Sequence, residues 1–213
     1  MSDARPTQHS EEPVVPLPDD EHRIVLLHSS GEVQKLSSLT NVAVLPGSFN
    51  PVHNGHRRLR SVAERMLGVS VVFEISVTNA DKPELTNWQL RNRLISLRGE
   101  VVALTRAPLF AQKSALFPGC SFVVGFDTAR RILDPRFYGN EPGGMISALS
   151  ALAAGGHRFL VAGRLREGTP ADRFETIEDL PVPSDLARLF HGIPEHDFRV
   201  DISSTMLRNR EPQ

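Results

Sequence analysis

The chain has 213 residues, 40% of them hydrophobic, and a formal charge of −1 at pH 7. This length suits one substantial domain and is too short for two comfortable ones. The near-zero charge gives no electrostatic reason to expect a nucleic acid or an acidic membrane surface as a partner. A single cysteine, Cys120, excludes an internal disulfide, and no apolar run approaches the roughly 20 residues of a membrane span. We therefore expect a cytoplasmic protein with Cys120 as a small core residue.

The first 21 residues differ in composition from the rest. They contain four prolines, six acidic residues and few large apolar groups. This composition is typical of a disordered tail, and it lacks the basic-then-apolar order of a secretory signal. We expect residues 22–213 to form the folded domain.

Short apolar runs alternate with helical patterns in that domain. The run at 42–45 is apolar throughout, as in a central parallel strand covered on both faces. The segment 58–67 then places Leu59, Val62, Ala63 and Met66 on one face of a helix. The other expected strands are Ile24–Leu27, 71–77, 101–104, 122–125 and 159–162. The other expected helices are 85–97, a segment through Ala129 and Ile132, 145–154, and a short one around 184–190 in an otherwise irregular segment, 167–194.

This alternation favours an α/β fold: a Rossmann-like, doubly wound parallel sheet with helices on both faces, in a single domain. Ligands bind such sheets outside the carboxyl ends of the strands. Polar residues follow three of the expected strands at that edge, in the segments 47–56, 125–127 and 163–164.

Residues 47–56, Gly-Ser-Phe-Asn-Pro-Val-His-Asn-Gly-His, join a strand to a helix. A helix N-terminus carries unpaired N–H groups and a partial positive charge, which suit a phosphate. His53 and His56 can donate hydrogen bonds to phosphoryl oxygens. Gly47 permits a close backbone approach of a nucleotide, and Gly55 lets a phosphate reach the helix start. The alternative is a surface turn with two incidental histidines.

A second polar constellation, Asp-Ile-Ser-Ser-Thr-Met-Leu-Arg, occupies residues 201–208. Ser203 and Ser204 are natural N-cap residues with hydroxyls for a phosphate. Arg208 follows about one helical turn later and can aim its guanidinium at the same anion. The alternative is a capped terminal helix with a solvated arginine.

The segment His53-Asn54-Gly55-His56 resembles the His-x-Gly-His signature of the nucleotidyltransferase superfamily, and residues 202–208 resemble its Ile-Ser-Ser-Thr-x-x-Arg signature. The resemblance implies that an acceptor phosphate attacks the α-phosphorus of a nucleoside triphosphate, without a nucleophilic side chain. It implies His53, His56 and Arg208 as catalytic residues. It also implies Mg²⁺ bridging the phosphate oxygens, with no dedicated carboxylate ligands in the protein.

Gly-Ser-Phe-Asn-Pro at 47–51, with Ile-Ser-Ser-Thr, is most similar to the nicotinamide or nicotinate mononucleotide adenylyltransferases, over roughly 42–210. The substrates so implied are ATP and a phosphorylated acceptor. The implied nucleotide contacts are Gly47, Ser48, Phe49, Gly55, Gly125, Asp127, Arg164, Ser203, Ser204 and Thr205. The acceptor candidates are Asn50, Lys82 and Trp88. The segment 134–144 departs from the family pattern and indicates a divergent branch.

Other interpretations stay open. Within the superfamily, the acceptor could instead be phosphopantetheine, or a cytidylyl group could pass to an alcohol phosphate. A nucleotide-binding protein without turnover is the alternative outside enzymes, and the oligomeric state stays open. Locally, Asp127 could be a helix N-cap, Arg164 a solvated loop residue and Trp88 a packing residue.

Overall fold

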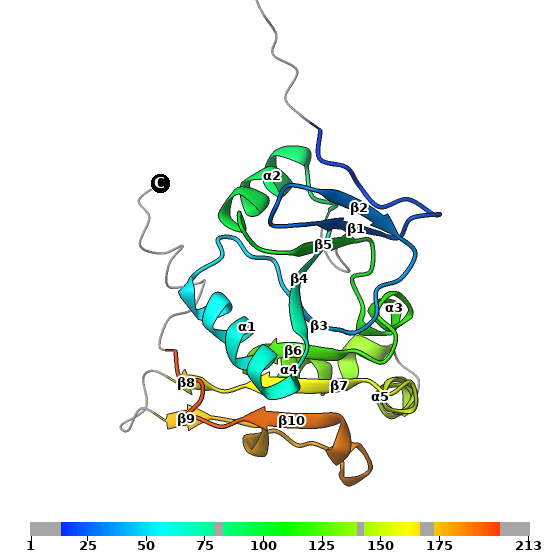
Figure 1. The fold of residues 1–213 in the computed structure, drawn as a ribbon. Coiled ribbons are helices and arrows are strands. Elements are labelled where there is room, and N and C mark those ends of the chain that lie inside the picture. Colours follow the sequence, from blue (N-terminus) through cyan, green and yellow to red (C-terminus); the bar gives the residue numbers. More distant parts are fainter. Residues whose placement is uncertain (1–13, 79–82, 140–142, 167–172, 201–213) are drawn as a thin grey trace, which may run out of the picture.

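The computed structural model describes residues 14–78, 83–139, 143–166 and 173–200, which build one eight-stranded sheet and a small two-stranded one (Figure 1). The large sheet has the order β10-β7-β6-β3-β4-β5-β1-β2. All pairings from β10 through to β5 are parallel. These strands are β3 (Val42–Pro46), β4 (Ser70–Ser76), β5 (Val102–Thr105), β6 (Ser121–Gly125), β7 (Arg158–Ala162) and β10 (Phe190–Ile193). The predicted fold class is confirmed.

Helices cover both faces of this sheet. They are α1 (Asn54–Leu67), α2 (Asn87–Ser96), α3 (Phe110–Leu116), α4 (Phe126–Ile132) and α5 (Gly144–Ala154). Alternate residues of each strand enter two separate hydrophobic cores. Ala43 and Leu45 pack with α1 and α2 on one face, and Val44 packs with α3, α4 and α5 on the other. This two-sided burial explains why the central strands are apolar throughout.

One edge of the sheet is antiparallel. β1 (Ile24–Leu27) pairs antiparallel with β5 and with β2 (Val33–Leu36). The doubly wound prediction did not include this hairpin. β2 has three exposed residues and the sequence Val-Gln-Lys-Leu, so its apolar signal is too weak for a strand prediction.

The segment expected to be irregular, 167–194, contains further structure. Within it, β9 (Arg173–Glu175) pairs in the two-stranded sheet with β8 (Arg164–Arg166), which lies just before the segment, and β10 adds a parallel strand beside β7. The expected helix around 184–190 is a 3₁₀ helix, and two others are also present. These 3₁₀ helices are Pro135–Tyr138, Ile177–Asp179 and Ser184–Leu189. The seven-residue α3 was also not expected.

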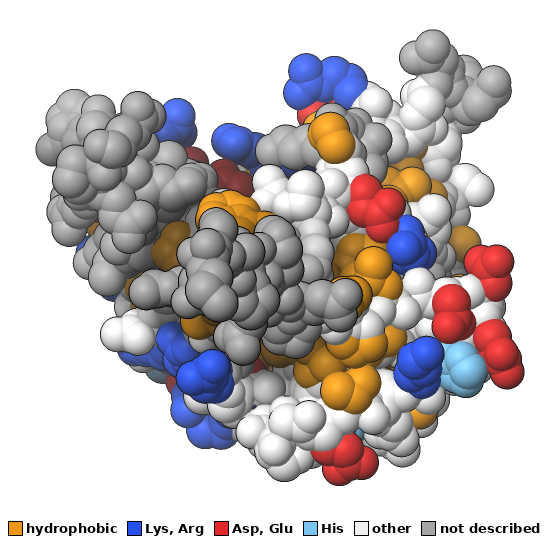
Figure 2. Space-filling view, turned by 90° about the horizontal axis from the view of Figure 1, so that it is seen from above, with side chains coloured by type: hydrophobic (Ala, Val, Ile, Leu, Met, Phe, Trp, Pro, Cys, Tyr) orange, Lys and Arg blue, Asp and Glu red, His pale blue; other side chains and the backbone are white. Residues whose placement is uncertain are grey.

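Part of the predicted tail packs against the domain. Pro18 is buried, and its carbonyl oxygen accepts a hydrogen bond from Arg106 Nε at 3.0 Å. Val15 N donates to Asn87 Oδ1 at 3.3 Å. The described part of the tail, 14–21, therefore makes contacts with the domain. Figure 2 looks onto the end of the molecule that carries β1, β2 and α2, and shows hydrophobic side chains gathered among charged ones.

Two further expectations concern single features. Cys120 is buried, as expected of a core residue. In the described parts of the chain, no helix has both the length and the apolar character needed to cross a membrane.

Candidate active site

The turn between β3 and α1 lies at the carboxyl ends of the parallel strands, on the left of Figure 1. Its side chains divide into exposed and buried ones: Ser48 and Asn50 are exposed, and Phe49 is only 2% exposed. The Phe49 ring lies edge-on to Phe73 and to His56, with centroid distances of 5.1 Å. The predicted nucleotide contact Phe49 is thus a core residue whose side chain supports the turn and His56.

Gly47 lies against this ring. A Cβ at Gly47 would be 2.7 Å from Phe49 Cζ, closer than real Cβ contacts. The absence of a side chain therefore lets the Phe49 ring fill the space under the turn, and Gly47 itself stays exposed at the surface. An exposed backbone at Gly47 is consistent with the expectation that a nucleotide can approach it closely.

The backbone at the start of α1 holds both predicted histidines. His53 is the N-cap of α1, and its Nδ1 accepts a hydrogen bond from Gly55 N at 3.1 Å. His56 Nδ1 accepts one from His53 N at 3.2 Å. The ring centroids are 3.8 Å apart. Because both Nδ1 atoms accept, each neutral ring carries its hydrogen on Nε2, which makes Nε2 the donor atom.

The surroundings keep both rings neutral. Burial lowers the pKa of His53. Burial, and then the charges of His53 and Arg57, lower the pKa of His56 to about 4. The first turn of α1 contains no acidic residue. At neutral pH the site therefore offers uncharged N–H donors beside the positive end of a helix, an arrangement that suits a phosphate.

We predict that the His56 imidazole titrates with a midpoint of about 4 in the folded protein, against an ordinary value of 6.5. The unfolded chain then binds more protons between these two values, so the free energy of unfolding decreases as pH falls from about 6.5 to 4. NMR titration of the histidine ring signals measures the midpoint. Urea unfolding of wild type and His56→Gln at pH 7 and pH 4.5 checks the linkage, since the variant should lose less stability on acidification. A His56 midpoint near 6.5 would contradict the prediction.

Gly55 lies between His53 and the segment that leads to the second motif. A Cβ there would be 2.9 Å from His53 Nδ1 and 3.0 Å from Val200 Cγ1. Arg58 Nη1 also donates to the Arg199 carbonyl oxygen at 3.1 Å. The residues directly before 201 therefore lie against the start of α1. The predicted site residues Ser203, Ser204, Thr205, Arg208 and Lys82 lie outside the described residues.

We predict that Gly55→Ala lowers kcat at least about tenfold, because displacing the His53 ring misplaces a donor by a fraction of an ångström or more. The effect on the free energy of unfolding should be smaller than the effect on the rate, because alanine favours the helix more than the glycine it replaces in the first turn of α1. Steady-state kinetics and thermal unfolding measure the two effects. The matched control is Ser61→Ala on the exposed face of α1. Gly68→Ala is not suitable as a control, because Gly68 has φ 69°, a backbone conformation that strains an alanine. Wild-type kcat in Gly55→Ala would contradict the prediction.

A second group of predicted residues meets where β6 and β7 end. Arg164 Nη1 donates to Asp127 Oδ2, and Arg130 Nη2 donates to Asp127 Oδ1 at 3.3 Å. The N-cap of α4 is Gly125, so the N-cap interpretation of Asp127 is wrong. A Cβ at Gly125 would meet no atom of the other described residues within 4 Å, which leaves open space at this glycine. Arg164 begins β8 rather than lying in a loop, and its side chain is ion-paired and 46% exposed.

The structure describes two of the three acceptor candidates, Trp88 and Asn50. Trp88 lies in the first turn of α2 and is 66% exposed, which excludes packing in the core. The helix start is fixed by a capping box, in which Thr86 Oγ1 accepts from Gln89 N and Gln89 Oε1 accepts from Thr86 N. Further along α2, burial lowers the pKa of Arg93. Asn50 is exposed on the neighbouring turn.

The sequence did not indicate two charged clusters near the site. One joins Arg57 to Glu100, 43 residues later. The other joins Glu74 on β4 to Lys113 on α3. Of these residues only Glu74 is conspicuous in the sequence, because its carboxylate interrupts the apolar run of β4. In the described part of the chain, no group of three or more His, Cys, Asp or Glu side chains could hold a metal ion.

Comparison with known proteins bears on the same region. Residues 44–100 match the cytidylyltransferase-like family, a span that includes the last three residues of β3, both histidines, α1 and α2. No curated protein matches the chain. The matched span is less than half of the 213 residues. Together with the His-x-Gly-His signature at 53–56 and the parallel sheet, the match supports an enzyme of the nucleotidyltransferase superfamily, whose shared reaction is nucleotidyl transfer.

Proposed function

We propose that the chain is an adenylyltransferase that transfers AMP from ATP to the phosphate of a nicotinamide or nicotinate mononucleotide. The observation that carries the proposal is the pair of neutral imidazoles at the start of α1, whose Nδ1 atoms are both occupied by backbone N–H groups. Their Nε2–H groups are preorganised donors beside a helix N-terminus, which is the equipment that phosphoryl chemistry requires.

The reaction needs no covalent intermediate with the protein. An oxygen of the acceptor phosphate forms a bond to the α-phosphorus, and the bond from that phosphorus to the bridging oxygen of the β-phosphate breaks. Pyrophosphate leaves with the electron pair. His53 and His56 donate to the oxygens on which negative charge gathers. Because His56 is neutral and half-buried, this hydrogen bond acts in a partly dry environment, where it contributes more than in water.

The other nucleotide contacts follow the strand ends. The open space beside Gly125 would take the nucleoside, with Asp127 accepting from ribose hydroxyls and Arg164 near the phosphates. Ser203, Ser204, Thr205 and Arg208 would hold the β- and γ-phosphates. Mg²⁺, held by phosphate oxygens and water, would neutralise charge on the triphosphate when bound.

The acceptor would lie between the turn and α2. Asn50 and the exposed Trp88 ring would contact the pyridine group, and Lys82 its phosphate. An exposed tryptophan at a helix start provides a flat apolar surface on which an aromatic ring can stack. This placement supports the pyridine nucleotide branch over acceptors without a ring.

A panel of acceptors tests the proposal. Pyrophosphate release is measured with ATP, Mg²⁺ and either nicotinamide mononucleotide, its acid form or phosphopantetheine, and products are identified by mass. A dinucleotide from either pyridine acceptor is expected. Product from phosphopantetheine alone would reassign the acceptor. No product with any acceptor, despite measurable ATP binding, would favour a nucleotide-binding protein without turnover.

A second candidate is cytidylyl transfer to an alcohol phosphate, which the matched family's description favours. Replacing ATP by CTP, with glycerol 3-phosphate as acceptor, tests this candidate in the same assay. Turnover with CTP and none with ATP would replace the adenylyl proposal by this one.

A further inference from the structure

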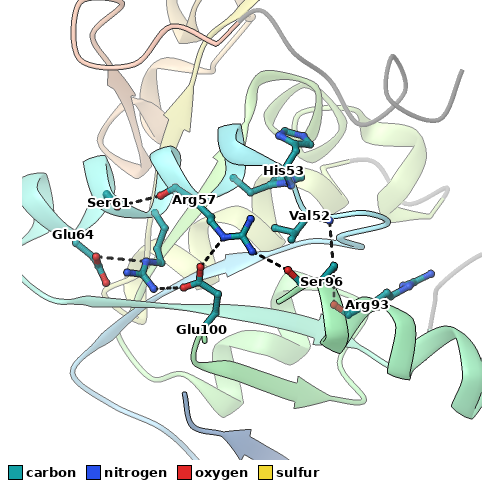
Figure 3. A network of polar contacts seen from close by, with 10 residues as sticks. Val52, His53, Arg57, Ser61, Glu64, Arg93, Ser96 and Glu100 are labelled. Atoms are coloured by element: carbon teal, nitrogen blue, oxygen red, sulfur yellow. Dashed lines mark hydrogen bonds and ion pairs between the residues drawn. The ribbon is translucent and has the colours of Figure 1, made fainter. Parts of the chain in front are cut away.

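A charged network joins the helix that carries the histidines to the helix on the acceptor side (Figure 3). Arg57 follows His56 directly in the chain. Its Nε donates to Glu100 Oε1 at 3.0 Å, and its Nη2 donates to the Ser96 carbonyl oxygen at 2.8 Å. Arg57 thus bridges α1 to the last residue of α2 and to the loop before β5.

Glu100 is nearly buried, and its two oxygens have different partners. Its side chain is 11% exposed. Arg57 occupies Oε1, and Arg60, one turn further along α1, donates to Oε2. Such a desolvated carboxylate with two guanidinium groups differs from an exposed ion pair, because removing it takes the counter-charge from Arg57 and leaves Arg60 only its pair with Glu64, at 3.6 Å.

A second link starts on the other side of the histidines. Val52, directly before His53, donates its N–H to Ser96 Oγ at 3.5 Å. The Ser96 hydroxyl in turn donates to the Arg93 carbonyl oxygen at 2.7 Å. Residues on both sides of His53–His56 therefore contact the same residue, Ser96, at the end of α2. In Figure 3 the His53 ring points away from this network.

We propose that Glu100 is a positioning residue, which through Arg57 and Ser96 fixes the two histidines relative to α2 and so aligns the acceptor with the α-phosphate. This inference rests on the proposed function. In-line transfer requires the attacking oxygen within a narrow range of distance and angle, and a misplacement of about 1 Å can cost about 10²-fold in rate. α2 carries Trp88, so its position relative to α1 sets the relative position of the two substrates.

The test compares Glu100→Gln and Arg57→Lys with a matched control on the same helix. Arg57→Lys keeps the charge but cannot reach Glu100 and the Ser96 carbonyl at once, because a lysine has no forked head group. The control is Arg65→Gln, which breaks the exposed pair between Arg65 and Asp197 two turns along α1. We expect kcat to fall about 10- to 100-fold in both network variants. The KM for ATP should stay within about twofold, because the ATP contacts themselves are retained. Arg65→Gln should retain wild-type kcat.

Histidine ring NMR signals provide a readout that does not depend on turnover. In Glu100→Gln the His53 and His56 signals should shift, and in Arg65→Gln they should not. Unchanged signals and unchanged kcat in a Glu100→Gln protein of lower melting temperature would overturn the proposal, since Glu100 would then only stabilise the fold. If wild type turns over no acceptor, the proposed function fails, and the ring signals alone decide whether Glu100 positions the histidines.

Discussion

Replacing His56 by alanine is expected to lower kcat by about 10²- to 10³-fold, the usual cost of removing one preorganised donor to a developing negative charge. The ring is held by His53 N at Nδ1 and by the edge of Phe49, so its Nε2–H is aimed before substrate arrives. Binding of ATP should be largely retained, because the helix N-terminus and the other phosphate contacts remain. Single-turnover kinetics with the acceptor that the panel of acceptors identifies measures the rate, and calorimetry measures ATP affinity.

Two controls separate this effect from damage to the fold. His191→Ala removes an exposed histidine from β10 and should leave kcat unchanged. His56→Gln keeps an N–H donor of similar reach and should recover part of the rate. A His56→Ala enzyme with wild-type kcat would exclude His56 from the reaction. Loss of ATP binding in parallel with rate would assign His56 to ground-state binding rather than to the transition state.

The start of α1 illustrates what the sequence could predict and what it could not. The apolar residues 58–67 predicted the helix, but α1 begins at Asn54. The usual N-cap residues are Ser, Thr, Asp and Asn; here a histidine ring takes that role, and the next residues are polar or glycine. The motif predicts that His53 and His56 bind phosphate, and this stays a prediction. The lowered pKa of His56 depends on burial and on the neighbouring His53 and Arg57, which only the three-dimensional arrangement defines.

The same distinction holds for the sheet. The apolar runs at 42–45 and 122–125 predict strands, because two-sided burial leaves a strong signal. β2 and β10 lie at the two edges and have no such signal. Pairs distant in the chain, such as Arg57 with Glu100, cannot be inferred from spacing, because nothing local to either residue requires the other.

Replacing Glu74 by alanine is expected to destabilise the fold by about 3–5 kcal/mol, since it leaves a buried ammonium group without its counter-charge. Glu74 is 1% exposed on β4, and Lys113 Nζ donates to both of its carboxylate oxygens at 2.7 Å. Lys113 also donates to the Ala107 carbonyl oxygen at 2.6 Å, and Thr105 Oγ1 donates to Glu74 Oε1 at 2.6 Å. The cluster attaches α3 and the end of β5 to the centre of the sheet. The expected loss is a large part of the roughly 5–15 kcal/mol that stabilises an ordinary domain.

Urea unfolding followed by circular dichroism measures this loss. The matched control is Glu195→Ala, which removes an exposed ion pair with Arg199 and should cost at most about 1 kcal/mol. Glu74→Leu combined with Lys113→Met should be more stable than Glu74→Ala alone, because apolar groups can replace a buried ion pair when both charges are removed. Glu74→Ala as stable as Glu195→Ala would show that Lys113 finds water or another partner once the carboxylate is gone. The stability of the double variant therefore decides whether this pair stabilises the sheet through its charges or only through the volume that it fills.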